Sequence, residues 1–293
     1  MGSASATDKA SPPAKDDSAP DRPGTALCAY TLAQIDAAQA SLGDQDLHEG
    51  IHLARKAVRR ARAVLALGNG LLGPGAGMID RELRGLNRGL STLRDAQALV
   101  ELLERQLRRE RKDDVREVLM RAREAAIAAR TQATTDGLRM DPGLQSRRAL
   151  LRVLRAALIA LEWEALTPVG LRMAVADTDL HALQARERAC AGGDDADWHR
   201  WRRRARRGSH ERRALEAANL PVDGASETFD KRTTERLGEA QDLTLLLEHC
   251  RRDSPFSKDD RHALRARAEP ALQRARRRIA RGVAERAGAC ATD

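Results

Sequence analysis

The sequence predicts an all-α protein made of two pseudo-symmetric helical bundles that arose by internal duplication. Aromatic residues make up only 2% of the 293 residues, while alanine, leucine and arginine dominate, a balance typical of helical bundles. No segment alternates polar and apolar residues with a period of two, the pattern of a half-buried strand. A basic helical segment at residues 52–62 occurs a second time at residues 199–207.

Each basic segment starts with a histidine, has an arginine three residues later, and has an arginine pair at the seventh and eighth positions after the histidine. With about 100° per residue on a helix, one narrow sector of the first copy holds four basic residues: His52, Arg55, Arg59 and Arg62. The opposite side carries alanine, valine and leucine. The segment therefore predicts an amphipathic helix with a basic face.

No Asp or Glu interrupts either basic segment, so like charges three and four residues apart destabilise the helix by roughly 0.2–0.5 kcal/mol per pair. Guanidinium groups without a local acid favour an external anion, and arginine suits phosphate because its planar group binds two oxygens at once. A single segment of this kind is more typical of a solvated basic face. The second copy favours an anion-binding site.

The two copies are 147 positions apart, and the same offset relates residues well beyond the helix. The matched pairs are Pro74 and Pro221, Gly77 and Gly224, Arg84 and Lys231, Leu90 and Leu237, Asp95 and Asp242, Glu101 and Glu248, and Arg105 and Arg252. No gap is needed across this span, which indicates an internal duplication. Two similar halves usually pack as a pseudo-symmetric pair, which would bring the two basic helices together.

The pattern His-x-x-Arg-x-x-x-Arg-Arg, followed about 35 residues later by Leu90–Asp95 and, in the second half, by Leu237–Asp242, resembles the CHAD domain, the conserved histidine α-helical domain. The resemblance covers roughly residues 27–288. It implies two helical bundles, a basic central groove and binding of inorganic polyphosphate. Some members of the family lie on polyphosphate or polyhydroxyalkanoate granules. Ser209, Gly208, Ser91 and Gln241 depart from the pattern.

The basic faces and the resemblance together assign polyphosphate binding to His52, Arg55, Lys56, Arg59, Arg60, Arg62, Arg84, Arg88, His199, Arg202, Arg203, Arg206, Arg207, His210, Arg213 and Lys231. Neighbouring arginines should keep the histidines neutral in the empty site, while bound phosphate favours the imidazolium form. We expect Asp95 and Asp242 to orient guanidinium groups through bidentate pairs, with plain surface charge as the alternative.

Taken in order, residues 1–26 lack periodicity and are expected to form a disordered tail. The remainder, 27–288, divides into a first bundle at about 27–140, a joining helix at about 144–166 and a second bundle at about 171–288. The expected helices cover about 27–41, about 46–67, 78–109, 113–134, 144–166, 171–190, 195–219, 226–252 and 257–287. The second of them is capped by Asp46 or Asp44 and stops at Gly68, and residues 73–77 are expected to form a connecting loop.

The net charge of +9 and an isoelectric point of about 10.1 indicate a polyanion or an anionic surface as partner. The four cysteines are scattered, which argues against a zinc site or a disulfide framework and for a cytoplasmic protein. We expect no metal, no cofactor and no membrane span. Phosphate-binding loops, nucleophile elbows and the zinc-protease motif are absent from the sequence, so the chain is expected to be no enzyme.

Two alternatives to polyphosphate binding stay open. A nucleic-acid-binding, nucleoid-type protein would share the basic charge, but few aromatic side chains are present for base stacking, so nucleic acid is expected only as a weaker competitor. A non-catalytic accessory subunit of a phosphate-metabolising enzyme would use the same basic face to feed a partner. Granule association is compatible with the leading hypothesis.

Overall fold

The computed structural model describes residues 23–68, 70–220, 231–251 and 254–290, with Lys231 and the last five of these residues described by their backbone alone. Within these ranges the chain folds into α-helices and two short 3-10 helices without a strand, which confirms the predicted all-α class. The helices are α1 (Pro23–Ser41), α2 (Leu47–Leu67), α3 (Pro74–Gly89), α4 (Ser91–Arg109), α5 (Asp113–Met140), η1 (Pro142–Leu144), α6 (Gln145–Ile159), η2 (Trp163–Ala165), α7 (Pro168–Cys190), α8 (Asp195–Ala217), α9 (Lys231–His249) and α10 (Lys258–Cys290).

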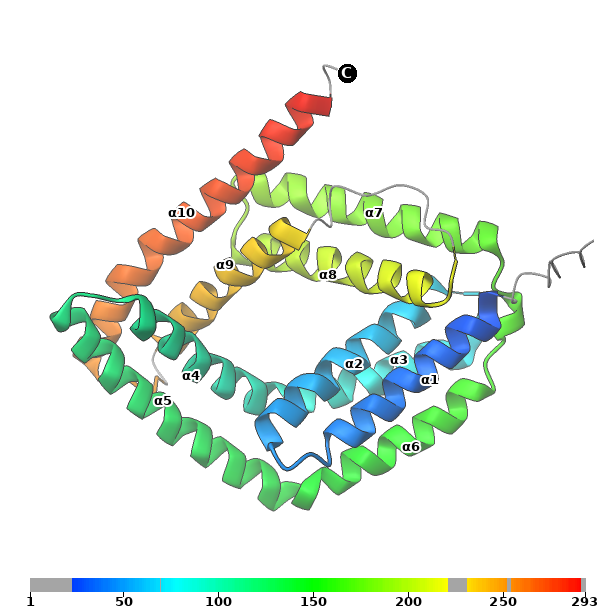
Figure 1. Ribbon diagram of the computed structural model, residues 1–293, viewed down its shortest axis with the longest axis horizontal. Helices are drawn as coiled ribbons and strands as arrows, with labels where there is room; N and C mark the ends of the chain where they lie inside the picture. Colours follow the sequence, from blue (N-terminus) through cyan, green and yellow to red (C-terminus); the bar gives the residue numbers. More distant parts are fainter. Residues whose placement is uncertain (1–22, 69, 221–230, 252–253, 291–293) are drawn as a thin grey trace, which may run out of the picture.

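Four of the helices form an inner layer that the others surround (Figure 1). The inner helices are α2, α4, α9 and α8. In this order each contacts the next, and α8 contacts α2, so that together they form a closed cycle. Each inner helix also packs against an outer helix adjacent to it in the chain: α2 against α1, α4 against α5, α8 against α7, and α9 against α10. This arrangement places both basic segments on inner helices.

The bounds of α2 follow from local chemistry. The Asp46 carboxylate accepts hydrogen bonds from the backbone N–H groups of His48 and Glu49, which otherwise have no partner in the first turn of a helix. The helix ends at Leu67 with Gly68 as its C-cap, at the stop that the sequence predicts. Its apolar side is buried, so α2 turns its basic side toward α4 and α8.

The single helix predicted at 78–109 is wrong, because the chain forms α3 and α4 with a break at Leu90. The Ser91 hydroxyl donates to the carbonyl oxygen of Arg88 at 2.6 Å, a local bond that competes with the helical pattern beside Gly89. The connecting loop predicted at 73–77 is also wrong, because α3 already begins at Pro74. Proline fits the first position of a helix, and Gly73 before it adopts φ 74°.

Other bounds differ by smaller amounts. Helix α1 begins at Pro23 rather than at about residue 27, again with proline in its first turn, and α5 continues to Met140. The predicted joining helix ends at Ile159 and is followed by η2. Predicted features at residues 1–22 and 226–230, and the duplication partners Pro221, Gly224 and Arg252, lie outside the described residues.

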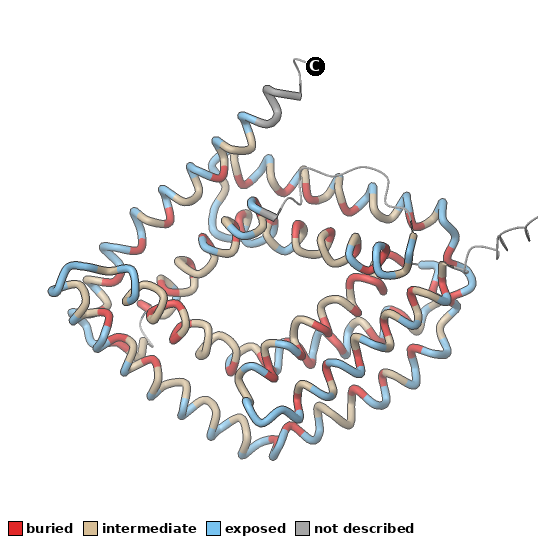
Figure 2. The backbone as a smooth tube through the Cα atoms, in the orientation of Figure 1, coloured by how far each residue is buried: buried red, intermediate tan, exposed pale blue. Residues whose placement is uncertain are grey.

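Three clusters of buried apolar side chains hold the helices together. Figure 2 shows where the buried residues lie along the backbone. The largest joins α1, α2, α3 and α6 with the start of α7 and the end of α8. The second joins α4 and α5 with the end of α9 and the start of α10, for example Leu103 and Leu119 with Leu264. The third joins α7 and α8 with α9 and α10 around Trp201. Two of the three clusters therefore combine helices from both halves of the chain.

Glu211, buried on α8 toward α7, makes stability depend on pH. Burial raises its pKa from 4.5 to about 7, although Arg207 and Arg212 favour the charged form. Because the folded protein holds this proton more tightly than the unfolded chain, the stabilisation is complete below about pH 4.5 and is lost as the pH rises to about 7. Thermal unfolding across this range should show that Glu211→Gln loses less stability than the wild type. If the stability of the two proteins changed with pH in the same way, the pH dependence would not come from Glu211.

Candidate functional site

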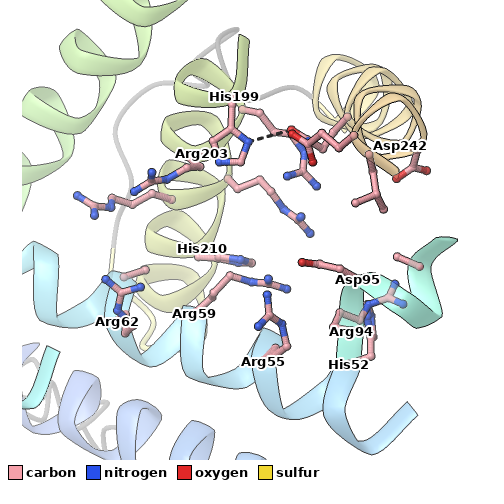
Figure 3. A pocket seen from close by; sticks show the side chains of 18 residues that line it. His52, Arg55, Arg59, Arg62, Arg94, Asp95, His199, Arg203, His210 and Asp242 are labelled. Atoms are coloured by element: carbon pink, nitrogen blue, oxygen red, sulfur yellow. Dashed lines mark hydrogen bonds between the residues drawn. The ribbon is translucent and has the colours of Figure 1, made fainter. Parts of the chain in front are cut away.

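A pocket of about 640 Å³ lies where the four inner helices face one another (Figure 3). We call it the central pocket. Its lining is dominated by basic side chains from α2 and α8, completed by residues of α4 and α9. The lining residues are His52, Arg55, Arg59, Arg62, Ala63, Arg94, Asp95, Ala98, His199, Arg202, Arg203, Arg206, Arg207, His210, Gln241, Asp242, Leu245 and Glu248.

The backbone positions these side chains because each basic helix is buried on its other side. On α2, residues such as Ala54 and Val58 pack into the first apolar cluster. On α8, Trp201 and Ala205 pack into the third. The 3.6-residue period then directs the arginines between them toward the central pocket. The lining of the central pocket therefore includes arginines from both basic segments.

The central pocket is strongly positive. Eight arginines and three carboxylates line it, which gives a net charge of +5 when the histidines are neutral. Two of these arginines are neutralised by bidentate ion pairs. Arg62 donates to Asp80 at 2.7 and 3.3 Å, and Arg94 donates to Glu101 at 3.2 and 3.1 Å.

The arginines at the middle of the pocket have no such partner. Arg59, Arg202 and Arg206 form no ion pair within the described part of the chain, and Arg55 donates only to the backbone carbonyl of Asn87. The Nε atoms of Arg55, Arg59 and Arg202 are buried without a hydrogen-bond partner there. Buried donors of this kind cost free energy unless a ligand or water satisfies them.

Burial and mutual repulsion act on these groups together. Burial lowers the pKa of Arg59 from 12.5 to about 9, with further contributions from the charges of Arg206, Arg55 and Arg202. Burial, followed by the charge of Arg206, lowers the pKa of Arg202 to about 10. Both groups therefore stay protonated at neutral pH. The Asp242 carboxylate offsets part of the charge of Arg202, but neither arginine forms an ion pair within the described residues.

Two of the three histidines in the pocket are held neutral. Burial, and next the charges of Arg206 and Arg59, lower the pKa of His210 from 6.5 to about 3. Burial followed by Arg94 lowers the pKa of His52. The Nε2 atom of His210 is buried without a hydrogen-bond partner among the described residues, and Figure 3 shows the ring beside Arg59. His199 Nδ1 lies 2.9 Å from Gln241 Oε1.

Neither of the two aspartates forms the expected bidentate pair. Asp242 accepts one hydrogen bond from Arg105 at 2.6 Å, a contact that links α9 to α4. Asp95 has no ion pair within the described residues, although Arg55 is the charge that acts on it most strongly. Burial raises the pKa of both carboxyl groups, and Arg55 and Arg105 offset part of that rise.

Several residues predicted for the site lie outside the central pocket. They are Lys56, Arg60, Arg84, Arg88 and Arg213, while the side chain of Lys231 is outside the described part. Arg60 is about 100° around α2 from Arg59 and points toward Gln34 of α1, at 3.4 Å. Arg84 is exposed and pairs with Asp80. Arg88 is exposed on α3.

Six residues of the lining were not predicted from the sequence: Ala63, Arg94, Ala98, Gln241, Leu245 and Glu248. The offset of 147 positions could have indicated some of them, because Gln241 corresponds to Arg94 and the predicted His210 corresponds to Ala63. Arg94 directly precedes Asp95 in the second motif. The pairing of Arg94 with Glu101, seven residues further along α4, could not be read from that motif.

Among the side chains described within residues 23–68, 70–220, 231–251 and 254–285, no group of three or more His, Cys, Asp or Glu could hold a metal ion. Among the helices that the structure describes, none combines the length and apolar character required to cross a membrane.

Comparisons with known proteins agree with this architecture. A family model described as the CHAD domain matches residues 26–251. A crystal structure of the CHAD domain from the plant Ricinus communis shares 21% identity at a TM-score of 0.52, covering 90% of this chain and 87% of that one. PptA from Streptomyces chartreusis shares 20% identity at a TM-score of 0.55, covering 86% and 98%. No curated protein matches the chain. At these identities the two solved structures indicate a common fold.

Proposed function

This chain belongs to the CHAD domain family, and from that membership we propose that its central pocket binds inorganic polyphosphate without catalysing a reaction. The observation that carries the proposal is the group of half-buried arginines at the middle of the pocket that form no ion pair within the described residues. Arg59, Arg202 and Arg206 come from two inner helices and line one cavity of about 640 Å³. A chain of phosphate groups supplies the oxygens and negative charges that these donors lack.

The energetics favour such a ligand. Each hydrogen bond between a guanidinium group and a phosphate oxygen contributes on the order of 1.5–3 kcal/mol. Bound phosphate would reverse part of the lowering of the pKa of Arg59 and His210, because a negative charge favours their protonated forms. Binding should therefore take up protons at the histidines. Of the candidate residues outside the pocket, none is needed for this proposal.

We also propose that the chain is an internal duplication whose halves together form a basic central groove. Support comes from the lining of the central pocket, which contains both members of many pairs 147 positions apart. These pairs are His52 and His199, Arg55 and Arg202, Arg59 and Arg206, Ala63 and His210, Arg94 and Gln241, Asp95 and Asp242, and Ala98 and Leu245. Within this groove, Asp95 beside Arg55 and Asp242 beside Arg105 are proposed to orient arginines.

The proposal leads to an expectation about location. A protein that binds polyphosphate in the cytoplasm would accumulate where that polymer is stored, so granule association is part of the proposal. Nucleic acid presents the same phosphate charge, but its bases would need stacking partners. No Phe, Tyr or Trp side chain lines the central pocket within the described residues.

A gel-shift titration with long-chain polyphosphate across a salt series tests the function. If Arg55, Arg59, Arg202 and Arg206 each neutralise one phosphate, the logarithm of the binding constant should fall with the logarithm of salt concentration with a slope of roughly −3, by analogy with single-stranded nucleic acid. Duplex DNA is the competitor. Displacement of polyphosphate by DNA at equal phosphate concentration would contradict the proposal.

A further inference from the structure

A second cluster of arginines lies where α9 packs against α10, outside the central pocket. It lines a pocket of about 630 Å³, which we call the α9–α10 pocket. Its lining consists of Arg232, Arg236, Arg274, Arg277, Arg278, Arg281, Gly282 and Glu285. Six arginines against one carboxylate give this small surface a net charge of +5.

The α9–α10 pocket is separate from the central pocket although both use α9. Arg236 lines the one and Gln241 the other, and five residues of helix correspond to a rotation of about 140° and a rise of about 7.5 Å. Leu245, also in the central pocket, lies about 180° around the helix from Arg236. The two pockets therefore open on opposite sides of α9.

The arginines of the α9–α10 pocket differ from their neighbours along α10 in lacking partners. Arg276 pairs with Asp195 at 2.6 Å, Arg265 lies 3.7 Å from Glu269, and Arg267 pairs with Glu110. Within the described residues, none of the six arginines in the pocket forms an ion pair.

The spacing of these arginines adds repulsion. Arg274 and Arg278, and also Arg277 and Arg281, stand four residues apart on α10, as do Arg232 and Arg236 on α9. Like charges at this spacing destabilise a helix. At Gly282, a Cβ atom would lie 3.2 Å from the guanidinium Nη1 of Arg236, so glycine leaves the space in which Arg236 meets α10. The two helices thus bring their cations together instead of separating them.

We propose that the α9–α10 pocket is a second phosphate-binding site, which takes a further stretch of the polyphosphate that the central pocket binds. The proposal rests on the proposed function for the identity of the polymer. Six guanidinium groups converging from two helices suit an anion with several phosphate groups. The lining has no aromatic side chain among the described residues, which favours inorganic phosphate chains over nucleic acid.

Calorimetric titration with tripolyphosphate tests the second site. The wild type should bind at two sites per chain. The α9–α10 variant, which carries Arg232→Ala, Arg236→Ala and Arg278→Ala, should keep only the central site. The central variant, which carries Arg59→Ala, Arg202→Ala and Arg206→Ala, should keep only the α9–α10 site. The matched control replaces three exposed arginines outside both pockets, Arg108, Arg152 and Arg188, and should keep both sites. Circular dichroism checks the fold of every variant.

The outcomes separate the two proposals. One site in the wild type, removed by the central variant, would overturn the second site and leave the proposed function intact. Loss of all binding in the α9–α10 variant, with full binding in the central variant, would overturn the function of the central pocket instead. An equal loss in the matched control would show a general charge effect and overturn the second site. So would tighter binding of duplex DNA than of tripolyphosphate to the central variant at equal phosphate concentration.

Discussion

A variant carrying Arg55→Glu, Arg59→Glu, Arg202→Glu and Arg206→Glu is expected to lose binding at the central pocket while it keeps its helical circular dichroism. Each reversal removes two units of charge, so the pocket changes from +5 to −3. Phosphate groups would then meet repulsion and would lose the donors that have no other ion-pair partner in the described chain. We expect the affinity of tripolyphosphate for this pocket to fall by at least about a thousandfold, the equivalent of losing about two charged hydrogen bonds.

The matched control reverses four exposed arginines outside both pockets: Arg108, Arg152, Arg172 and Arg188. Both variants change the net charge of the chain from +9 to +1, since four reversals remove eight units. Long-range attraction of a polyanion is therefore weakened equally in the two proteins. If the control loses as much affinity as the pocket variant, net charge and not the pocket accounts for binding.

Trp201→Ala is expected to lower the free energy of unfolding by about 3–5 kcal/mol, the usual cost of removing a large aromatic side chain from a core. Trp201 is fully buried, and its ring lies 5.5 Å from that of Trp198. It belongs to the cluster that joins α8 to α9 and α10, and it directly precedes Arg202 of the central pocket. Chemical denaturation monitored by circular dichroism measures the loss.

Trp201→Phe is the conservative companion. It keeps an aromatic ring in the cluster and removes the indole N–H, which is buried without a hydrogen-bond partner among the described residues. The loss of stability should therefore be clearly smaller than for Trp201→Ala. A loss below about 1 kcal/mol for Trp201→Ala would mean that this cluster does not hold α8 in place.

The sequence predicted the fold class and the start of α2 well because both depend on local chemistry. An aspartate at position 46 caps the helix wherever the rest of the chain lies, and the 3.6-residue period separates the basic side of α2 from its apolar side. The break at Leu90 was not predictable in this way. Residues 78–109 keep a helical pattern across it, and only the Ser91 bond to Arg88 reveals the interruption.

For the site, the sequence predicted which residues share one face of a helix, but not which of them line the central pocket. Arg59 and Arg60 belong to the same motif, yet Arg59 lines the central pocket and Arg60 faces Gln34. The position of α1 decides which of the two arginines faces the central pocket. The helical periodicity of the sequence does not predict that position. The same holds for Arg84, whose neighbour Asp80 pairs with it and also with Arg62. Contacts between helices, and not the composition of a motif, decide which arginines remain available.

The second apolar cluster has a consequence for how such a chain could arise. It joins Leu103 and Leu119 from the first half to Leu264 and Phe256 from the second, so each half alone would expose apolar surface to water. If the chain descends from a single copy that was later doubled, that ancestor could have covered this surface by pairing with an identical molecule. Gene fusion would then have turned an obligate homodimer into one polypeptide, with α6 beside the former junction.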